Sequence, residues 1–453
     1  MKELPVTQPT VSMISLGCPR TLVDSELYLG RLKQVGYQVV DEVSGSDVAI
    51  INTCSFIQDS IKESIDTILQ AVKLKQQGKI KAVVVAGCLV QRFKQDLVKE
   101  LPEVDGFIGV DGFGDVDTVV ARALNGEHAE SFRPHPNVPH QGRKVARSAL
   151  TPSHYAYLKI SEGCLKGCSF CVIPKIKGPL SSRKIEDVVD EAKQLIEERG
   201  VTELIVVGQD TSDYGVDLYK QPQIAPLLEK LGKLNPLRWI RLLYCHPHGV
   251  SQELIETIRD VPSVCKYLDM AIEHADDGVL KQMNRIVTQA QLRNTIARLR
   301  KEIPDIALRT SVIVGFPGET EAAFENLLGF LKDIAFERLG AFTYSHEEGS
   351  ASYRYPNQIP EAIRQQRFDR LMQLQQSIAQ EITGKSIGQR YEVLIDEQDP
   401  SDGAQYLGRT RADCPEVDGV VFIQSEKPLK PGEFVTAEIT DHLEYDLVGR
   451  VVV

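Results

Sequence analysis

The sequence has no long hydrophobic run. No stretch of its 453 residues approaches the roughly 18 apolar residues that a membrane-spanning helix needs. The first ten residues, MKELPVTQPT, also lack the apolar core of a signal peptide. These two absences predict a cytoplasmic protein that has no membrane partner.

The composition also lacks any strong bias. Hydrophobic residues make up 42% of the chain and charged residues 25%, which excludes disordered, collagen-like and coiled-coil proteins. At roughly 150 residues per domain, 453 residues predict about three globular domains.

Basic residues are fewer than acidic ones. The chain has 52 Lys and Arg against 63 Asp and Glu, a net charge of −11. This balance argues against a wide nucleic-acid footprint and favours a basic partner.

The cysteines number nine, which is odd and therefore unsuited to a complete set of disulfides. In a reducing compartment, thiols serve more often as metal ligands, catalysts or small buried side chains. Their positions in the chain are therefore more informative than their number.

Two successive regions of the chain have α/β patterns. From residue 11 to about 123, short apolar runs such as VSMISL, DVAII and KAVVVA alternate with helical stretches, which predicts an open parallel sheet of βαβ units. From about 155 to 349, six apolar strands alternate with helices, which predicts a partial (β/α)6 barrel whose functional end is formed by the strand C-termini.

The rest of the chain has a different composition and a different pattern of apolar residues. A Pro-rich and basic segment without acidic residues separates the two α/β regions, and a tail of short strands and turns predicts a small all-β, OB-like barrel. We therefore divide the α/β chain into an amino-terminal domain (1–130), a linker (131–152), a central domain (153–384) and a carboxy-terminal barrel (386–453).

The strongest local signal is a CxxxCxxC run formed by Cys164, Cys168 and Cys171, directly after the first strand of the central domain. Iron–sulfur clusters usually take four cysteines, so three ligands on a four-iron cluster leave one iron open for chemistry. A zinc loop completed by a distant His or Cys is the alternative reading.

Three further cysteines end three predicted strands of the amino-terminal domain. Cys18 follows VSMISLG, Cys54 follows DVAIINT and Cys88 follows KAVVVAG. Because the carboxyl ends of parallel strands meet at one edge of a sheet, we expect these thiols to converge. They predict a second cluster with an open iron, whereas each alone is more often a small buried side chain.

The CxxxCxxC run matches the radical S-adenosylmethionine (SAM) superfamily, and the whole chain resembles the methylthiotransferases of that superfamily. The stretches GCPRTLVDSE, INTCSFI, AGCLVQR, GCSFCVIPKIKGPLSSR, VGQDTSDYG and GFPGETE carry the resemblance. It implies an amino-terminal methylthiotransferase domain, a radical SAM core and a closing TRAM domain, with two [4Fe-4S] clusters.

Four other segments are similar to the branch of the family that modifies ribosomal protein S12, namely ISEGCLKGCSFCVIPKIKG, WIRLLYCHP, AFTYSHEEGSASY and RTRADCPEVDG. This resemblance implies a transferase that inserts sulfur at the β-carbon of an S12 aspartate and methylates it, which gives a methylthio group. SAM would serve as both radical source and methyl donor. A sulfur source and an electron donor such as flavodoxin or ferredoxin would be further partners.

The resemblance also assigns SAM contacts, and it assigns no side-chain acid or base, because the clusters would carry the chemistry. Glu273 stands where the family usually has Gln. The expected contacts are Phe170, Gly208, Gln209, Glu273, Arg285, Arg309 and Ser311.

The carboxy-terminal barrel is acidic. Residues 390–453 contain 14 acidic and 6 basic side chains, so the barrel would attract a basic protein such as S12 and would not bind tRNA stably. We expect Asp413, Glu416 and Asp418 to belong to this docking surface. A tRNA-modifying methylthiotransferase and a non-catalytic metal-binding module that docks on ribosomes are the alternatives.

Overall fold

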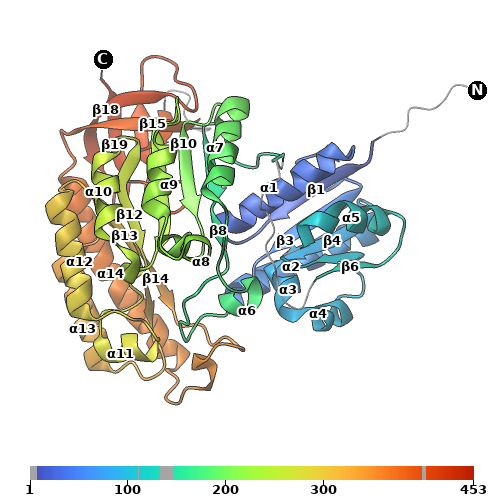
Figure 1. Cartoon of the computed structure of the whole chain (residues 1–453), viewed down its shortest axis with the longest axis horizontal. Helices are drawn as coiled ribbons and strands as arrows, with labels where there is room; N and C mark the ends of the chain where they lie inside the picture. Colours follow the sequence, from blue (N-terminus) through green and yellow to red (C-terminus); the bar gives the residue numbers. More distant parts are fainter. Residues whose placement is uncertain (1–7, 111, 133–145, 400–404, 453) are drawn as a thin grey trace, which may run out of the picture.

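The computed structural model describes residues 8–110, 112–132, 146–399 and 405–452. An amino-terminal α/β domain lies beside a larger central α/β domain, and a small β-barrel covers one end of the central domain (Figure 1). Among the described helices, none is both long and apolar enough to cross a membrane.

The amino-terminal domain is a parallel sheet with the order β2-β1-β3-β4-β5-β6. Its strands are β1 (Thr10–Ser15), β2 (Gln38–Val39), β3 (Val48–Thr53), β4 (Ala82–Gly87), β5 (Gly106–Ile108) and β6 (Ala129–Ser131). The neighbouring strands β1, β3 and β4 are those that precede Cys18, Cys54 and Cys88. The predicted open parallel sheet is confirmed.

Helices cover both faces of this sheet, and the largely apolar strands β3 and β4 are buried along their whole length. One face packs on α1 (Pro19–Gln34) and α5 (Val116–Leu124). The other packs on α2 (Gln58–Gln76), α3 (Cys88–Phe93) and α4 (Gln95–Glu100).

The central domain is a curved sheet of six parallel strands in the order β14-β13-β12-β11-β10-β7. They are β7 (Tyr155–Lys159), β10 (Glu203–Val207), β11 (Trp239–Cys245), β12 (Val264–Met270), β13 (Ala307–Val314) and β14 (Arg338–Thr343). These are the six strands expected from the sequence, so the partial (β/α)6 barrel is confirmed.

Six helices cover the outer face of this sheet through one large apolar core. They are α7 (Ile185–Arg199), α9 (Ile224–Leu231), α10 (Gln252–Asp260), α12 (Gln289–Glu302), α13 (Glu321–Ile334) and α14 (Glu361–Gly384). The sequence did not predict a small hairpin-like pair near the cysteine loop, formed by β8 (Ser161–Glu162) and β9 (Ser181–Ser182). Short helices α6 (Ile173–Lys177), α8 (Val216–Tyr219) and α11 (Asp277–Gln282) lie in the connections.

The carboxy-terminal domain is a closed five-stranded barrel with the order β15-β16-β17-β19-β18, as predicted. Its strands are β15 (Arg390–Gln398), β16 (Gln405–Arg409), β17 (Val421–Gln424), β18 (Phe434–His442) and β19 (Leu447–Val451). The barrel packs against the first residues of the central strands.

A buried ionic cluster joins the two domains. Glu203 at the start of β10 lies between Arg241 of β11 and Arg409 of β16, at 3.0 and 2.8 Å, and all three side chains are buried. The pKa of Glu203 is lowered, because the two guanidinium groups outweigh the effect of its burial. The carboxy-terminal barrel is thus held on the central domain by fully desolvated charges.

The structure corrects the expected docking role of Asp413 and Asp418. Asp413 is buried and forms an ion pair with Arg338, while Asp418 is within 3.3 Å of Arg309 and accepts a hydrogen bond from Tyr267 at 2.7 Å. Both carboxylates face the central domain and not the solvent. Glu416 is exposed, although its carboxylate also reaches the hydroxyl of Tyr155, at 3.3 Å.

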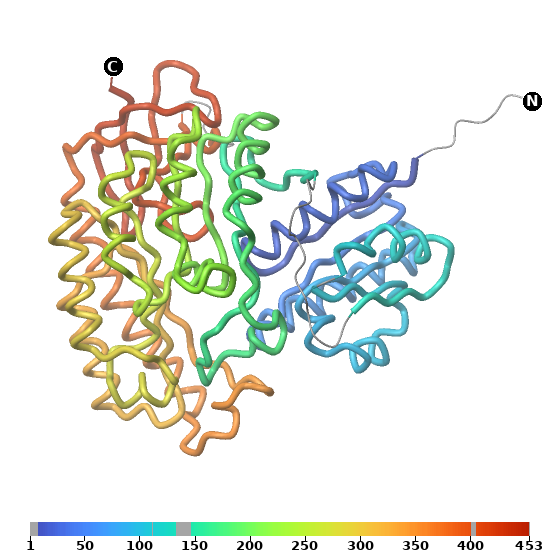
Figure 2. Tube along the Cα trace, viewed as in Figure 1, coloured from blue at the N-terminus to red at the C-terminus, as the bar shows by residue number. Residues whose placement is uncertain are grey.

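Salt bridges also attach the amino-terminal domain to the central domain. Part of the predicted linker, residues 133–145, lies outside the described residues, but Arg147 near its end donates to Glu26 of α1 and to Glu191 of α7, each at 2.8 Å. Asp24 of α1 reaches Lys159 of β7. Figure 2 shows the resulting approach of α1 (blue) to the green part of the central domain.

The cluster around Glu203 leads to a stability prediction. We expect Glu203→Ala to lower the free energy of unfolding by about 3 kcal/mol or more, since it leaves two buried arginines without their shared carboxylate. Denaturant unfolding can be followed by the fluorescence of Trp239, the chain's one tryptophan, which donates to Glu392 of the carboxy-terminal barrel.

The control is Arg293→Gln, which removes a solvent-exposed ion pair with Asp333. Such a pair contributes less than about 1 kcal/mol. Equal losses in the two variants would contradict the role assigned to the buried cluster.

Candidate functional site

The three cysteines of the amino-terminal domain converge at one edge of its sheet, as expected. Gly17 and Gly87, which precede Cys18 and Cys88, both have positive φ angles, of 93° and 97°. A Cβ on Gly17 would lie 2.7 Å from the Cβ of Cys54, and one on Gly87 would lie 2.8 Å from the carbonyl oxygen of Thr53. Only glycine lets the three strand ends approach so closely.

Arg20 makes Cys18 the most acidic thiol of this set. Its Nε donates to the Cys18 sulfur at 3.4 Å, and Thr21 Oγ1 lies 3.6 Å from the same sulfur. Burial alone would raise the pKa of Cys18, but the positive charge and hydrogen bond of Arg20 lower it to about 7. Burial instead raises the pKa of Cys88 to about 12.

Each thiol of the CxxxCxxC loop accepts one N–H donor. The backbone N–H of Lys166 donates to Cys164 at 3.3 Å, that of Ile173 to Cys171 at 3.4 Å, and Arg285 to Cys168 at 3.6 Å. Hydrogen bonds of this kind stabilise cluster-bound thiolates. Without a cluster, burial raises the pKa of Cys164 to about 11 and that of Cys171 to about 12.

Within the described part of the chain, no group of three or more His, Cys, Asp or Glu side chains is close enough to bind a single metal ion. A cluster needs a wider spacing, because each thiolate binds a different iron atom. The converging thiols and their N–H donors fit such a group.

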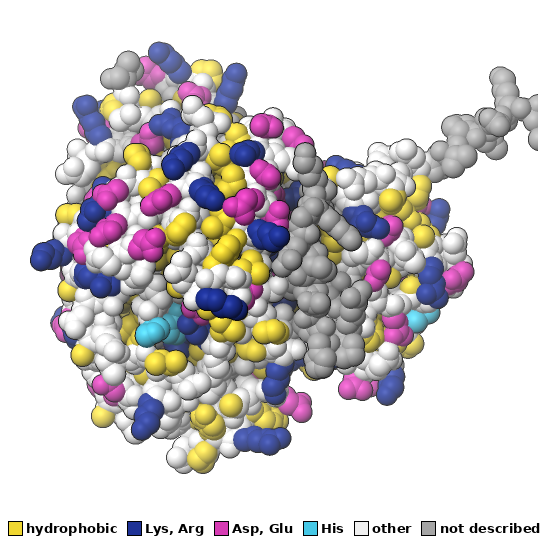
Figure 3. Space-filling view, viewed as in Figure 1, with side chains coloured by type: hydrophobic (Ala, Val, Ile, Leu, Met, Phe, Trp, Pro, Cys, Tyr) yellow, Lys and Arg dark blue, Asp and Glu magenta, His cyan; other side chains and the backbone are white. Residues whose placement is uncertain are grey.

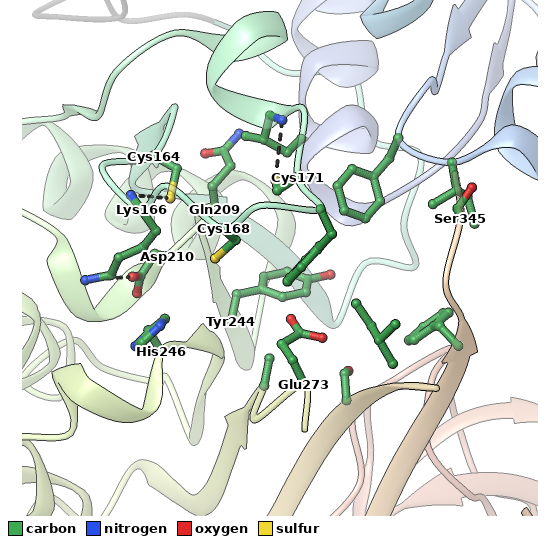
Figure 4. Close-up of a pocket in the computed structure, with 18 of the residues that line it drawn as sticks. Cys164, Lys166, Cys168, Cys171, Gln209, Asp210, Tyr244, His246, Glu273 and Ser345 are labelled. Carbon is green, nitrogen blue, oxygen red and sulfur yellow. Dashed lines mark hydrogen bonds and ion pairs between the residues drawn. The ribbon is translucent and has the colours of Figure 1, made fainter. Parts of the chain in front are cut away.

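A cavity of about 410 Å³ lies at the carboxyl ends of the central strands. Cys164, Cys168 and Cys171 line it together with Cys18 of the amino-terminal domain. In the view of Figure 4, Cys164 and Cys168 lie on one side, Glu273 and Ser345 lie on others, and the Tyr244 ring is near the centre. One cysteine of the amino-terminal set and all three of the CxxxCxxC loop thus line the same cavity.

A helix-to-helix contact also connects the two segments that carry the cysteines. Helix α6 begins two residues after Cys171, and its Ile176, with Val172, packs on Cys88 at the start of α3. This apolar, buried contact joins the start of α3 to the loop of Cys171.

Five of the seven side chains expected to contact SAM line the cavity: Phe170, Gln209, Glu273, Arg285 and Ser311. Glu273 has a positive φ of 67°, which is rare for a residue with a side chain. Its backbone N–H donates to Ser311 at 2.9 Å and its carbonyl accepts from Ile313 at 2.7 Å, so β13 holds it in that conformation. Burial raises the pKa of its carboxyl.

Gly208 and Arg309 do not line the cavity. The Gly208 carbonyl accepts a hydrogen bond from Arg20 at 3.0 Å. Arg309 lies in the first half of β13, where it pairs with Asp269 at 3.0 Å and with Asp418. Asp269 of β12 and Asp418 of the carboxy-terminal barrel thus hold its guanidinium, and its contact with SAM stays a prediction.

Several residues of the cavity wall were not predicted from the sequence, and three of them stand out. Tyr244 has a positive φ of 61° where the register of β11 against β12 is irregular, and this bulge turns its ring towards the cavity. Lys166 forms an ion pair with Asp213 at 2.8 Å, beside the cysteine loop. Arg20 follows Cys18 by two residues, and this closeness to a predicted cluster ligand is the one sequence feature that indicates its place at the site.

Comparison with protein-family models divides the chain in the same way as its fold. The radical SAM superfamily matches residues 158–331, an uncharacterized family, UPF0004, matches 10–109, and the TRAM domain matches 387–452.

Curated relatives match the chain over nearly its full length. The ribosomal protein uS12 methylthiotransferase RimO of Clostridioides difficile is 43% identical over 441 residues, which cover 97% of this chain and 98% of the relative. The chain belongs to the RimO family. The members of the family from Caldanaerobacter subterraneus and Bdellovibrio bacteriovorus are 45% and 43% identical and cover 97% and 100% of this chain.

Solved structures support the fold alone. A radical SAM methyltransferase, TsrM from Kitasatospora setae, superposes with a TM-score of 0.55 at 14% identity and covers 74% of this chain and 75% of its own. Membership of the RimO family makes the chain a methylthiotransferase enzyme, and the radical SAM match implies SAM and a [4Fe-4S] cluster as its cofactors.

The pKa difference between the amino-terminal thiols predicts unequal reactivity in metal-free protein. The thiolate is the reactive form, so at pH 8 iodoacetamide should modify Cys18 roughly a hundredfold faster than Cys88, or more. Below pH 7 the Cys18 rate should fall about tenfold per pH unit as the thiol becomes protonated. Peptide mass spectrometry at a series of pH values measures both rates.

Arg20→Gln should remove this advantage, because burial alone raises the pKa of Cys18. If the alkylation rate of Cys18 in Arg20→Gln kept its wild-type dependence on pH, the electrostatic role of Arg20 would be disproved.

Proposed function

We propose that this enzyme inserts sulfur at the β-carbon of an aspartate of ribosomal protein S12 and methylates that sulfur, which gives a methylthio group. The substrate rests on the name of the relatives, which match 97% of the chain or more. The observation that carries the chemistry is the single cavity lined by both Cys18 and the three cysteines of the CxxxCxxC loop.

Cys18, Cys54 and Cys88 are proposed to hold the second [4Fe-4S] cluster. Support comes from their place on three adjacent strand ends, from the glycines that allow close approach, and from the Arg20 hydrogen bond to Cys18. Soft thiolates suit an iron–sulfur centre, and three of them leave one iron free to hold sulfur.

The cofactors, when bound, supply a radical, a methyl group and sulfur, and the protein orients and shields them. Arg285 is buried, donates to Cys168 and to the Ala271 carbonyl, and so orients one side of the radical cluster loop. Glu273, just after β12, and Ser311, within β13, line the cavity where the proposed SAM contacts lie. Phe56 and Phe342 border the same cavity with apolar rings.

A basic protein suits the charge of this enzyme better than tRNA does. The chain carries a net charge of −11, and the carboxy-terminal barrel keeps exposed acids such as Glu397, Glu416 and Glu444. On the face drawn in Figure 3, acidic and basic side chains are interspersed without a large patch of one sign. Because Asp413 and Asp418 are paired internally, we propose that the exposed acids of the carboxy-terminal barrel attract the substrate protein.

The cycle also needs partners that the chain does not contain. We propose a low-potential electron donor, such as flavodoxin or ferredoxin, for the radical cluster, and an external sulfur source for the second cluster. No stable binding of tRNA is proposed.

Offering both substrates to the reconstituted enzyme tests the assignment. With SAM, sulfide and a reductant under anaerobic conditions, S12 and bulk tRNA are placed in one reaction and analysed by mass spectrometry. We expect a methylthio mass gain on one S12 aspartate peptide and no change in tRNA. A gain on tRNA instead would keep the chemistry and overturn the substrate.

Cysteine variants separate the two clusters. Cys168→Ala should abolish the formation of 5′-deoxyadenosine, because it removes a ligand of the radical centre. Cys54→Ala should retain SAM cleavage and block sulfur insertion. Cys265→Ala, which changes a buried thiol outside both sets and outside the cavity lining, is the control. Sulfur insertion by Cys54→Ala would refute the second cluster.

Charge reversal tests docking on the barrel. The double variant Glu397→Lys and Glu444→Lys should weaken S12 binding and reduce its dependence on salt, since steering by exposed charges is screened by ions. Glu229→Lys with Glu253→Lys makes the same charge change on exposed sites of the central domain. Equal effects of the two pairs, measured by titration at several salt concentrations, would rule out a docking role for the barrel.

A further inference from the structure

Three cationic side chains line the cavity, and among the described residues only Lys166 of the three forms ion pairs with carboxylates. Lys166 is within 2.8 Å of Asp213 and 3.6 Å of Asp210. Arg285 is buried and donates to the Ala271 carbonyl and to Cys168. The third, Arg20, enters the cavity from the amino-terminal domain.

Arg20 is held in place without a carboxylate. Its Nε donates to Cys18 at 3.4 Å, its Nη1 donates to the Gly208 carbonyl at 3.0 Å, and its guanidinium lies 4.9 Å from the centre of the Tyr244 ring. Among the described residues, no Asp or Glu lies within ion-pair distance of it. A half-buried guanidinium whose plane is fixed in this way is preorganised for a planar anion.

The position of Arg20 matches the demands of the substrate. The β-carbon of an aspartate is bonded directly to its carboxylate, so that carboxylate must enter the cavity together with the reacting carbon. The acidic side chains that line the cavity, Asp210, Glu273 and Glu347, would repel it. A carboxylate that leaves water needs a cationic partner, and Arg20 lies between Cys18 and the strand ends, where the two sets of cysteines meet.

We propose that Arg20 binds the side-chain carboxylate of the substrate aspartate and so selects aspartate over asparagine. This inference rests on the proposed function, because it assumes an aspartate of S12 as the substrate. Arg20 belongs to helix α1 of the amino-terminal domain, so that domain contributes to substrate recognition in addition to its three cysteines.

The test compares two substrates on each enzyme. Wild-type, Arg20→Gln and Arg20→Lys enzymes, each reconstituted and assayed for iron content, are titrated with S12 and with S12 whose modified aspartate is changed to asparagine. Wild type should bind the aspartate form roughly tenfold more tightly or better, as expected for a hydrogen-bonded charge pair. In Arg20→Gln the ratio of the two dissociation constants should fall to about one, and in Arg20→Lys part of the preference should return.

Because both substrates are measured on the same enzyme, any effect of Arg20→Gln on the nearby cluster or on folding cancels from the ratio. The matched control is Arg31→Gln on the same helix, which breaks a half-exposed ion pair with Asp117 far along α1 and should keep the full preference.

An equal preference for aspartate in wild type and Arg20→Gln would overturn the inference, as would a wild-type enzyme that binds both forms equally. These outcomes differ from a failure of the proposed function, in which wild-type enzyme would transfer no methylthio group to S12.

Discussion

The contact between helix α1 and the central domain is the constraint on which the rest of the site depends. Asp24 of α1 meets Lys159 and Lys177, which both also face Glu162, and all four side chains are mostly buried. Taking one member away leaves an unpaired charge out of water, so the geometry of this network is strongly specified. It places Cys18 and Arg20, a turn or so earlier in the chain, at the edge of the cavity of the central domain.

The carboxy-terminal barrel has a second role beside any attraction of a partner. Several of its charges neutralise arginines at the start of the central strands, as Asp413 does for Arg338 and Asp418 for Arg309. The net charge of a domain therefore overstates the charge it offers to a partner, because part of it is used internally. The barrel closes the end of the sheet opposite the cavity and leaves the strand C-termini to the chemistry.

Local patterns predicted much of this molecule. The six central strands, the closed barrel and the convergence of Cys18, Cys54 and Cys88 follow from apolar runs and from their place at strand ends, and each of these depends on neighbours in the sequence. The docking roles expected of Asp418 and Asp413 failed for the opposite reason. Their partners are about 110 and 75 residues away in the chain, and no periodicity reports on them.

The sequence alone determined which residues have the chemistry of cluster ligands, because cysteine spacing and strand alternation are properties of the chain. The tertiary structure decided which charges face solvent and which face each other, and it brought Arg20 to the Gly208 carbonyl, 188 residues away. Long-range ion pairs and a bulged strand end made those choices, since burial of a charge depends on what packs over it. The cavity that Cys18 shares with the three cysteines of the CxxxCxxC loop is thus a product of domain packing.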